Sequence, residues 1–258
     1  CKLARSFGTK LALINPDTSY GKSMSMGMRM LGPKFGLEVV ADLFYAADAT
    51  VFAPQIAAIK ANPEIQFIAA LGAEPAGGLC VAALREAGIT LPILITNEQA
   101  TPKIVGIERV RNGYAAEPRV YLVATACDCW ETLPKDDPRR IVIEERSKLH
   151  EKMVGRKIAG LSDVYGFSYW AYIEDIWGRL LKDQPGILDQ DLPIIRSAVR
   201  DYMETIKDLF GVGALVYFTP EDHNGIIPGT AWLIARFKYP PPYEYVPGFE
   251  AATPPWKK

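Results

Sequence analysis

Continuous apolar runs alternate with stretches of helical character along the first hundred residues of the chain. An apolar run without polar alternation is typical of a strand that is covered on both faces. Strands that alternate with helices of about 10–15 residues indicate βαβ units and a parallel sheet. The pattern therefore predicts a doubly wound α/β fold with parallel sheets. The predicted strands are Leu11–Asn15, Leu37–Phe44, Ile65–Leu71 and Leu91–Thr96, and the predicted helices are Gly21–Phe35, Thr50–Ala61 and Gly77–Ala87.

The pattern changes after residue 100. The stretch Thr101–Pro118 is polar and contains Gly106 and Gly113, which predicts an irregular segment that crosses between two parts of the chain. Longer helical stretches follow this segment, so the second part differs in character from the first. The elements predicted here are strands Arg119–Thr125, Val212–Phe218 and Trp232–Phe237 and helices Arg140–Met153, Ser162–Leu181 and Leu192–Leu209.

Length and charge limit the classes of partner. The chain has 258 residues, which is enough for one large domain or two smaller ones. Its formal net charge is −1 and it has no dense block of Lys and Arg, so nucleic acid is not an expected partner. The longest apolar runs, such as Phe67–Leu71, are far too short to span a bilayer.

Cysteine and histidine are too sparse to indicate a disulfide scaffold or a metal centre. Cys127 and Cys129 are one residue closer than a usual zinc pair, which favours a structural, redox-silent pair, and His150 and His223 stand apart in the sequence. The segment Gly72–Gly78 fits neither spacing of a glycine-rich phosphate loop. His223 follows Asp222, but a general base also needs a partner network and a pocket. The chain has four cysteines, Cys1, Cys80, Cys127 and Cys129. We therefore expect no metal, no cofactor and no catalysis.

Five segments, in this order along the chain, carry a likeness to a known family: Leu11–Ser23, Phe44–Lys60, Ile65–Gly72, Ala87–Thr96 and Gly211–Gly225. Together they resemble the ABC-transporter substrate-binding proteins of the branched-chain amino-acid type, which have the type I periplasmic binding protein fold. That resemblance implies two α/β lobes that close on a ligand in the cleft between them. It also implies that the chain is non-enzymatic.

The resemblance assigns the parts of the chain to the two lobes. Residues 1–113, with a return strand at about 230–250, resemble most of the second lobe, and residues 114–229 resemble the later half of the first lobe. The family's opening half of the first lobe has no counterpart here, so the fold is expected to be N-terminally truncated, with Cys1–Phe7 as the tail of a helix. The uncovered apolar surface would then be protected by a separate chain or by self-association.

Candidate ligand-binding residues follow the ends of three predicted strands. Tyr20 matches the family's ligand-contacting Tyr in a Tyr-Gly turn, although a Tyr packed at a helix start is the alternative. Ala73 stands where amino-acid-binding relatives carry an aromatic residue, and Glu74 offers either a ligand carboxylate or an ordinary solvated loop residue. Relatives pair the ligand's ammonium with a carboxylate at the third strand end, where Asn97 aligns and Glu98 is one residue away.

The ligand class stays open at this point. Ala73 and Asn97 weaken the expectation of an amino acid, and an aromatic or other carboxylic acid is the alternative. Four aromatic residues suit a flat ligand, but two of them lie i,i+4 on a helix, which is more typical of core packing. These residues are Trp130, Tyr165, Tyr169 and Trp170.

The resemblance implies a solute-binding protein that delivers a small organic solute to an ABC permease. It implies a periplasmic or other extracytoplasmic location, although this chain carries no signal peptide. The alternative is a ligand-sensing regulatory module of the same fold that acts through a protein partner. For the solute-binding protein, hinge closure is expected near Thr101–Pro118 and Gly225–Thr230.

Overall fold

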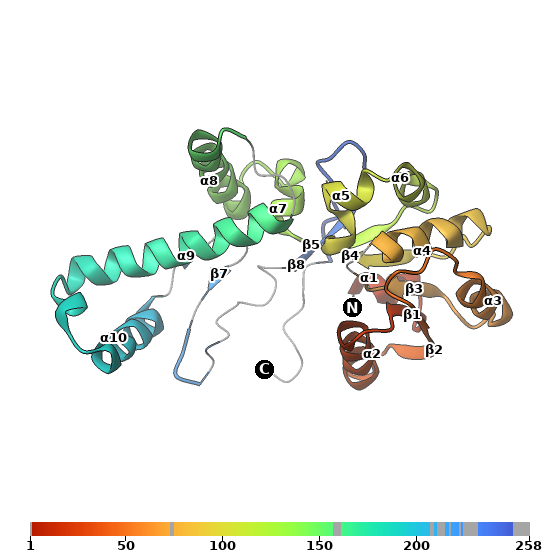
Figure 1. Cartoon of the computed structure of the whole chain (residues 1–258), viewed down its shortest axis with the longest axis horizontal. Helices are drawn as coiled ribbons and strands as arrows, with labels where there is room; N and C mark the ends of the chain where they lie inside the picture. The colour runs from red at the N-terminus through yellow and green to blue at the C-terminus, as the bar shows by residue number, and fades with distance from the viewer. Residues whose placement is uncertain are drawn as a thin grey trace. The chain divides into compact units, whose positions relative to one another are not determined.

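The computed structural model describes residues 2–72, 75–156, 161–206, 209–210, 215–216, 218–221, 223 and 232–249 (Figure 1). The chain divides into two compact units, residues 1–124 with 233–258 and residues 125–232. It passes from one unit to the other between Ala124 and Thr125 and again between Trp232 and Leu233. Within the described ranges, no helix is both long enough and apolar enough to cross a membrane.

A seven-stranded sheet forms the centre of the first unit. Its strand order is β2-β1-β3-β4-β5-β8-β9. The pairings β1–β2, β1–β3, β3–β4 and β4–β5 are parallel, and β9 runs antiparallel to β8. The prediction of an α/β fold with a mostly parallel sheet is confirmed. The strands are β1 (Lys10–Pro16), β2 (Glu38–Tyr45), β3 (Phe67–Ala70), β4 (Ile93–Thr96), β5 (Tyr121–Thr125), β8 (Trp232–Arg236) and β9 (Glu244–Tyr245).

Helices cover both faces of this sheet, as Figure 1 shows for α2 and α4 on opposite sides of the strands. From β1 the chain moves to β2 on one side and later returns to β3 on the other, so the winding direction reverses next to β1. Such a reversal opens a crevice outside the carboxyl ends of the strands, where ligands of open α/β sheets bind. The helices are α1 (Lys2–Phe7), α2 (Ser19–Leu31), α3 (Ala53–Ala61), α4 (Pro75–Glu86), α5 (Pro102–Val105) and α6 (Glu108–Ala115), with 3-10 turns η1 (Gly32–Phe35) and η2 (Asn97–Ala100).

One apolar cluster anchors β1 and β3 against the helices α1 and α2. Leu11 and Leu13 of β1 are fully buried and pack with Phe67 and Ala69 of β3. Met24 and Met28, one turn apart on α2, pack on the same cluster. The Met-rich segment after the first strand therefore forms the cover of the strand that precedes it.

The edge strand β2 is protected by side-chain amides. Gln55 Nε2 donates to the backbone oxygen of Phe44 at 2.6 Å, and Asn62 Nδ2 donates to that of Val40 at 3.4 Å. Unpaired carbonyls on an edge strand are a template for pairing with another chain. These two amides occupy acceptors that such a pairing would use.

Residues 101–118 do not form the expected irregular crossing segment. They contain α5 and α6, which belong to the first unit and pack near α4. Gly113 allows this close packing, because a Cβ there would lie 2.6 Å from the Cα of Ala82 in α4. Gly113 is therefore a contact point between helices, and Gly106 is the C-cap of α5.

The described part of the second unit is mainly helical. Helix α10 packs on α9 through Ile206 and Ile176, which are buried, together with Tyr172, Val199, Tyr202 and Met203. The predicted strand Val212–Phe218 contains β7, and most of its other residues lie outside the described ranges. The elements are α7 (Ala126–Cys129), η3 (Trp130–Thr132), α8 (Pro138–Val154), α9 (Leu161–Asp183), η4 (Ile187–Asp189), α10 (Leu192–Thr205) and the antiparallel pair β6 (Leu209–Phe210) and β7 (Leu215–Val216).

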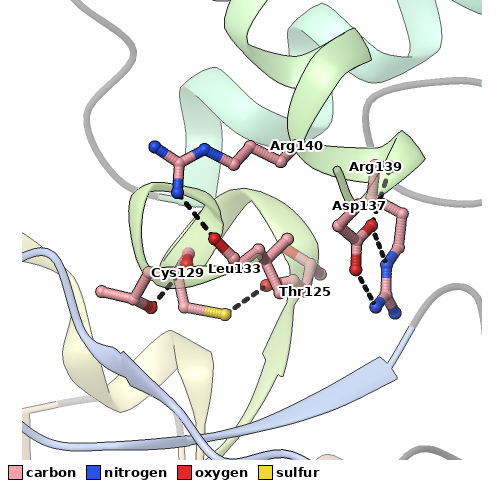
Figure 2. A network of polar contacts seen from close by, with 7 residues as sticks. Thr125, Cys129, Leu133, Asp137, Arg139 and Arg140 are labelled. Carbon is pink, nitrogen blue, oxygen red and sulfur yellow. Dashed lines mark hydrogen bonds and ion pairs between the residues drawn. The ribbon is translucent and has the colours of Figure 1, made fainter. Parts of the chain in front are cut away.

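Polar contacts hold the junction between α7, η3 and α8 (Figure 2). Thr125 and Asp128 form a capping box at the start of α7. Arg140 Nη1 donates to the backbone oxygen of Leu133 at 2.6 Å, and Asp137 caps α8 while its carboxylate takes two hydrogen bonds from the Arg139 guanidinium. These contacts tie residues of α7, η3 and the start of α8 to one another.

Candidate functional site

The turn between β1 and α2 holds Tyr20 above the end of β1. Thr18 caps α2, accepting from the Gly21 backbone N–H at 3.3 Å, and the Thr18 N–H donates to the Pro16 backbone oxygen at 2.8 Å. Gly21 lies so close to the strand end that a Cβ there would be 2.0 Å from the Pro16 oxygen. The glycine of the Tyr-Gly turn is therefore required for this approach, which places Tyr20 in the first turn of α2.

Tyr20 and Glu98 meet at the carboxyl edge of the sheet. The Tyr20 hydroxyl donates to Glu98 Oε2 at 3.3 Å, and the Tyr20 side chain remains 39% exposed. Glu98 is half-buried in η2, directly after β4. Two of the five predicted ligand-binding residues are thus brought into contact in a position open to a small molecule.

Asn97 is more buried than the adjacent Glu98. Its side chain is 6% exposed, whereas Glu98 is half-buried and reaches Tyr20. The carboxylate at this strand end is therefore supplied by Glu98. Whether Asn97 or Glu98 contacts a ligand stays a prediction.

The turn η2 is fixed from within the unit. Thr96 Oγ1 donates to the Gly72 backbone oxygen at 3.0 Å, which ties the end of β4 to the segment after β3. Gln99 accepts from the Thr96 N–H at 3.3 Å, and the buried Tyr114 hydroxyl donates to the Gln99 backbone oxygen at 3.2 Å. Burial raises the pKa of Tyr114, so this phenol stays a donor. Glu98 therefore lies in a turn whose flanking residues, Thr96 and Gln99, are both hydrogen-bonded to other parts of the unit.

Asn15, the last but one residue of β1, is a buried polar group that the sequence reasoning did not single out. Its side chain is fully buried, and neither its oxygen nor its nitrogen has a hydrogen-bond partner among the described residues. The available signal was a polar residue at the end of an otherwise apolar run, next to the turn that carries Tyr20.

Several predicted residues lie outside the described structure. Ala73 and Glu74 are not among the described residues, so their part in the site remains a prediction. The same holds for Asp222, for the hinge segment Gly225–Thr230 and for the side chains of Tyr165, Tyr169 and Trp170. Trp130 lies in η3 and is half-buried.

The two histidines have local partners. His223 Nε2 lies 2.9 Å from Glu204 Oε1, and His150 is buried with Nδ1 3.0 Å from the Arg156 backbone oxygen. Among the described residues no three His, Cys, Asp or Glu side chains gather as a metal site would require.

The three described cysteines are buried, free thiols. Burial raises the pKa of Cys80 and of Cys129 to about 12, and it raises that of Cys127 as well. Since the thiolate is the nucleophile and the metal ligand, these cysteines are held in their unreactive form.

Comparison with known proteins agrees with the α/β fold. Residues 2–121 match the family described as periplasmic binding protein. The structure of an extracellular ligand-binding receptor from Rhodopseudomonas palustris HaA2 is similar, with 21% sequence identity and a TM-score of 0.75. The match covers 95% of this chain and 64% of the receptor. A leucine binding protein from Thermotoga maritima is 14% identical with a TM-score of 0.65, covering 92% and 59%. A fatty acid ABC transporter substrate-binding protein from Thermomonospora curvata is 15% identical with a TM-score of 0.65, covering 98% and 60%.

These similarities extend over most of this chain but not over most of the other proteins. The chain spans 64% or less of the length of the three solved structures. No curated protein matches it. At these sequence identities the solved structures show the fold of the chain but not its ligand.

Proposed function

Since residues 2–121 match the periplasmic binding protein family, we propose that the chain is a protein of this family that captures a small organic solute for uptake by an ABC transporter. The observation that carries the proposal is the contact between Tyr20 and Glu98 at the point where the winding of the sheet reverses. Open α/β sheets bind their ligands at this place. The proposed partners are a small-molecule ligand and an ABC permease, and the proposed location is periplasmic or otherwise extracytoplasmic.

The paired side chains define what this wall of the site recognises. The Tyr20 ring covers an apolar part of a ligand, and its hydroxyl donates or accepts a hydrogen bond. Glu98 supplies a carboxylate that accepts from an ammonium or hydroxyl group and repels an unprotonated acid. An amino acid fits this pair directly. An aromatic or other carboxylic acid fits when its acid group points away from Glu98.

The relatives support a small organic solute without fixing which one. One similar structure is named a leucine binding protein and another a fatty acid substrate-binding protein. Both names describe molecules with an apolar body and a polar end. We propose that a solute of that kind binds to residues 1–113, which correspond in this proposal to the family's second lobe.

We further propose that residues 114–229 correspond to the later half of the family's first lobe and that a separate chain or self-association completes this lobe. The expected architecture has surfaces that such a partner would cover. The proposed activity is capture and delivery, with no covalent step.

Isothermal titration calorimetry of the 258-residue chain tests the proposal. The probes are L-leucine, L-phenylalanine, benzoate and octanoate, each titrated into the wild-type chain and into Glu98→Gln. We expect one probe to bind the wild-type chain and to bind Glu98→Gln at least about fivefold more weakly, because a charge-assisted hydrogen bond is lost. Absence of heat for all four probes, or equal affinity of the two proteins, would contradict the proposal.

A further inference from the structure

The segment that follows β8 forms a hairpin within the first unit. Strand β9 pairs antiparallel with β8, and Phe237 and Tyr243 stand directly after β8 and directly before β9. Their ring centroids lie 5.8 Å apart, and the two side chains are 1% and 7% exposed. The prolines Pro240–Pro242 stand between them, and their fixed φ angles limit the conformations of the loop. The hairpin therefore holds a buried phenol, that of Tyr243, in one place.

Tyr243 reaches the turn that carries Glu98. Its hydroxyl donates to the backbone oxygen of Ala100, the last residue of η2 and 143 positions away in the sequence. The Tyr114 hydroxyl, from α6, donates to the backbone oxygen of Gln99 at 3.2 Å. Two buried phenols from different parts of the chain therefore bind consecutive carbonyl groups of the same turn.

The two phenols are joined through Phe237. The rings of Tyr114 and Phe237 pack edge to face with their centroids 5.2 Å apart, and Phe237 also packs on Tyr243. Aromatic pairs of this geometry are favourable beyond the area that they bury. The Phe237 N–H donates to the backbone oxygen of Val120, directly before β5, at 2.9 Å. The hairpin, α6 and η2 are therefore connected by one buried aromatic cluster, Tyr114, Phe237 and Tyr243.

These hydrogen bonds bear on Glu98 because the residues that follow it are buried. Gln99 is 0% and Ala100 4% exposed, so water has little access to them. Carbonyl groups at a helix end have no partner within the helix, and a buried one that is left unpaired is unfavourable. Without the Tyr243 hydroxyl, the Ala100 carbonyl must turn toward water or another donor, and the backbone of η2 moves with it. Glu98 would then leave the position in which it accepts from Tyr20.

We propose that Tyr243, together with Tyr114, is a positioning residue that acts on the ligand through Glu98. This inference rests on the proposed function and deepens it, because it links the occupied site to the hairpin of β8 and β9. Such a link is reciprocal: the hairpin favours ligand binding, and the bound ligand in turn stabilises the hairpin. The chain enters this hairpin from the second unit between Trp232 and Leu233, so ligand binding stabilises one of the two connections between the units.

A double-mutant cycle measured by calorimetry on the whole chain tests this role. The four proteins are the wild-type chain, Tyr243→Phe, Glu98→Gln and the chain with both substitutions. The probe is whichever of L-leucine, L-phenylalanine, benzoate and octanoate binds the wild-type chain most tightly. The matched control is Tyr121→Phe, whose ring packs on Phe7 at 5.2 Å and which makes no hydrogen bond to η2 in the described structure. Tyr114→Phe takes the place of Tyr243→Phe if the latter does not fold, and the melting temperature without ligand is measured for every protein.

The expected result separates positioning from a general effect on folding. Tyr243→Phe binds the probe about fivefold more weakly than the wild-type chain, as for one lost hydrogen bond. In the Glu98→Gln background the same substitution changes affinity by less than about twofold, because the group that it positions is gone. Probe binding also slows hydrogen exchange in peptides that cover residues 233–246 of the wild-type chain, and this slowing is absent in Tyr243→Phe. Tyr121→Phe behaves as the wild-type chain does in both measurements.

Three results would overturn the inference, and one of them reaches further. If Tyr243→Phe melts at a lower temperature but binds the probe as tightly as the wild-type chain, while Glu98→Gln binds it more weakly, Tyr243 only stabilises the fold and the proposed function stands. If Tyr243→Phe loses the same affinity with and without the Glu98 carboxylate, Tyr243 does not act through Glu98. If none of the four probes binds the wild-type chain, the proposed function fails and this inference fails with it.

Discussion

The Tyr20 hydroxyl donates to the Glu98 carboxylate at 3.3 Å, although the two residues are 78 positions apart in the sequence. Tyr20 follows β1 and Glu98 follows β4, and β3 lies between these strands in the sheet. All three strands are parallel, so their carboxyl ends share one edge. A side chain as long as that of Tyr20 therefore bridges the end of the intervening strand, and the pair marks the centre of the candidate site.

Removal of the Tyr20 hydroxyl should weaken binding more than stability. Tyr20→Phe keeps the ring and loses the bond to Glu98, and Tyr20 is 39% exposed, so little burial changes. We expect ligand affinity to fall about fivefold to tenfold, as for one lost hydrogen bond. Calorimetry with the tightest-binding probe measures this change.

The matched control is Tyr239→Phe. Tyr239 is also exposed, and its ring lies against the Arg111 guanidinium at 4.8 Å, a contact that the phenylalanine retains. Its affinity for the probe should equal that of the wild-type chain. A loss of affinity of the same size in both variants would indicate a general effect of the substitution and contradict the assignment of Tyr20.

Two glycines of α2 should respond to alanine in opposite ways. In Gly21→Ala the new Cβ would lie 2.0 Å from the Pro16 backbone oxygen, so the start of α2 must shift. We expect a loss of roughly 1–3 kcal/mol in the free energy of unfolding, the range for overpacking, together with weaker ligand binding. Chemical denaturation measures the first effect and calorimetry the second.

Gly27→Ala lies in the same helix, and a Cβ there meets no described atom within 4 Å. Alanine should stabilise the helix interior there by up to about 1 kcal/mol. Equal effects of the two substitutions would show that the Tyr20 turn does not depend on the close approach of Gly21 to β1.

The ion pair at the start of α8 should make stability depend on pH in the acid range. Hydrogen bonds from Arg139 hold the pKa of Asp137 below its usual 3.8, and the two side chains are 10% and 13% exposed (Figure 2). A carboxyl whose pKa is lower in the folded state stabilises the fold above the unfolded value, and this contribution disappears as the pH falls through the folded pKa. Asp137→Asn should therefore cost about 2 kcal/mol at pH 6 and progressively less below pH 3.8.

Glu144→Gln provides the control on the same helix. Glu144 pairs with Lys148 at 2.9 Å, but both side chains are largely exposed, and such pairs contribute little. At pH 6 its effect on the midpoint of denaturation should be smaller than that of Asp137→Asn. A difference between wild type and Asp137→Asn that grows toward acid pH would contradict the assigned role of this pair.

The buried thiols should resist alkylation in the folded chain. The raised pKa values of Cys80, Cys127 and Cys129 leave little thiolate at pH 8, and burial denies access to the reagent. Peptide mass spectrometry after iodoacetamide treatment should find these three cysteines unmodified without denaturant and fully modified in guanidinium chloride. Rapid native modification of the peptide with Cys127 and Cys129 would indicate a reactive pair instead.

The sequence predicted an element most accurately where its apolar pattern and its flanking turn residues indicated the same structure. The run Leu11–Asn15 corresponds to β1 within one residue at each end, because unbroken apolar residues between turn residues have few other places in an α/β fold. The helix predicted at Thr50–Ala61 begins only at Ala53, just before Pro54, where proline is tolerated in a first turn. The stretch 101–118 was misread because Gly113, which permits close helix packing, and Gly106, which caps α5, look in the sequence like glycines of a loop.

The sequence indicated which strand ends carry the candidate residues, but not how their side chains meet. The family resemblance, together with the positions at strand ends, selected Tyr20 and the region of Asn97 and Glu98. The choice between these two depends on a capping box in which Thr96 and Gln99 fix the turn, and this turn buries Asn97 while Glu98 reaches Tyr20. Asn15 was not recognised because its lack of partners is a property of the folded core.

The most direct test of the central claim is hydrogen-exchange mass spectrometry of the chain with and without the tightest-binding probe. If the ligand binds at the carboxyl ends of β1 and β4, exchange slows in peptides that cover Asn15–Gly21 and Thr96–Ala100 and stays unchanged in those of α8. Slower exchange confined to other segments, such as α9 and α10, or no change with any probe, would contradict a binding site at Tyr20 and Glu98.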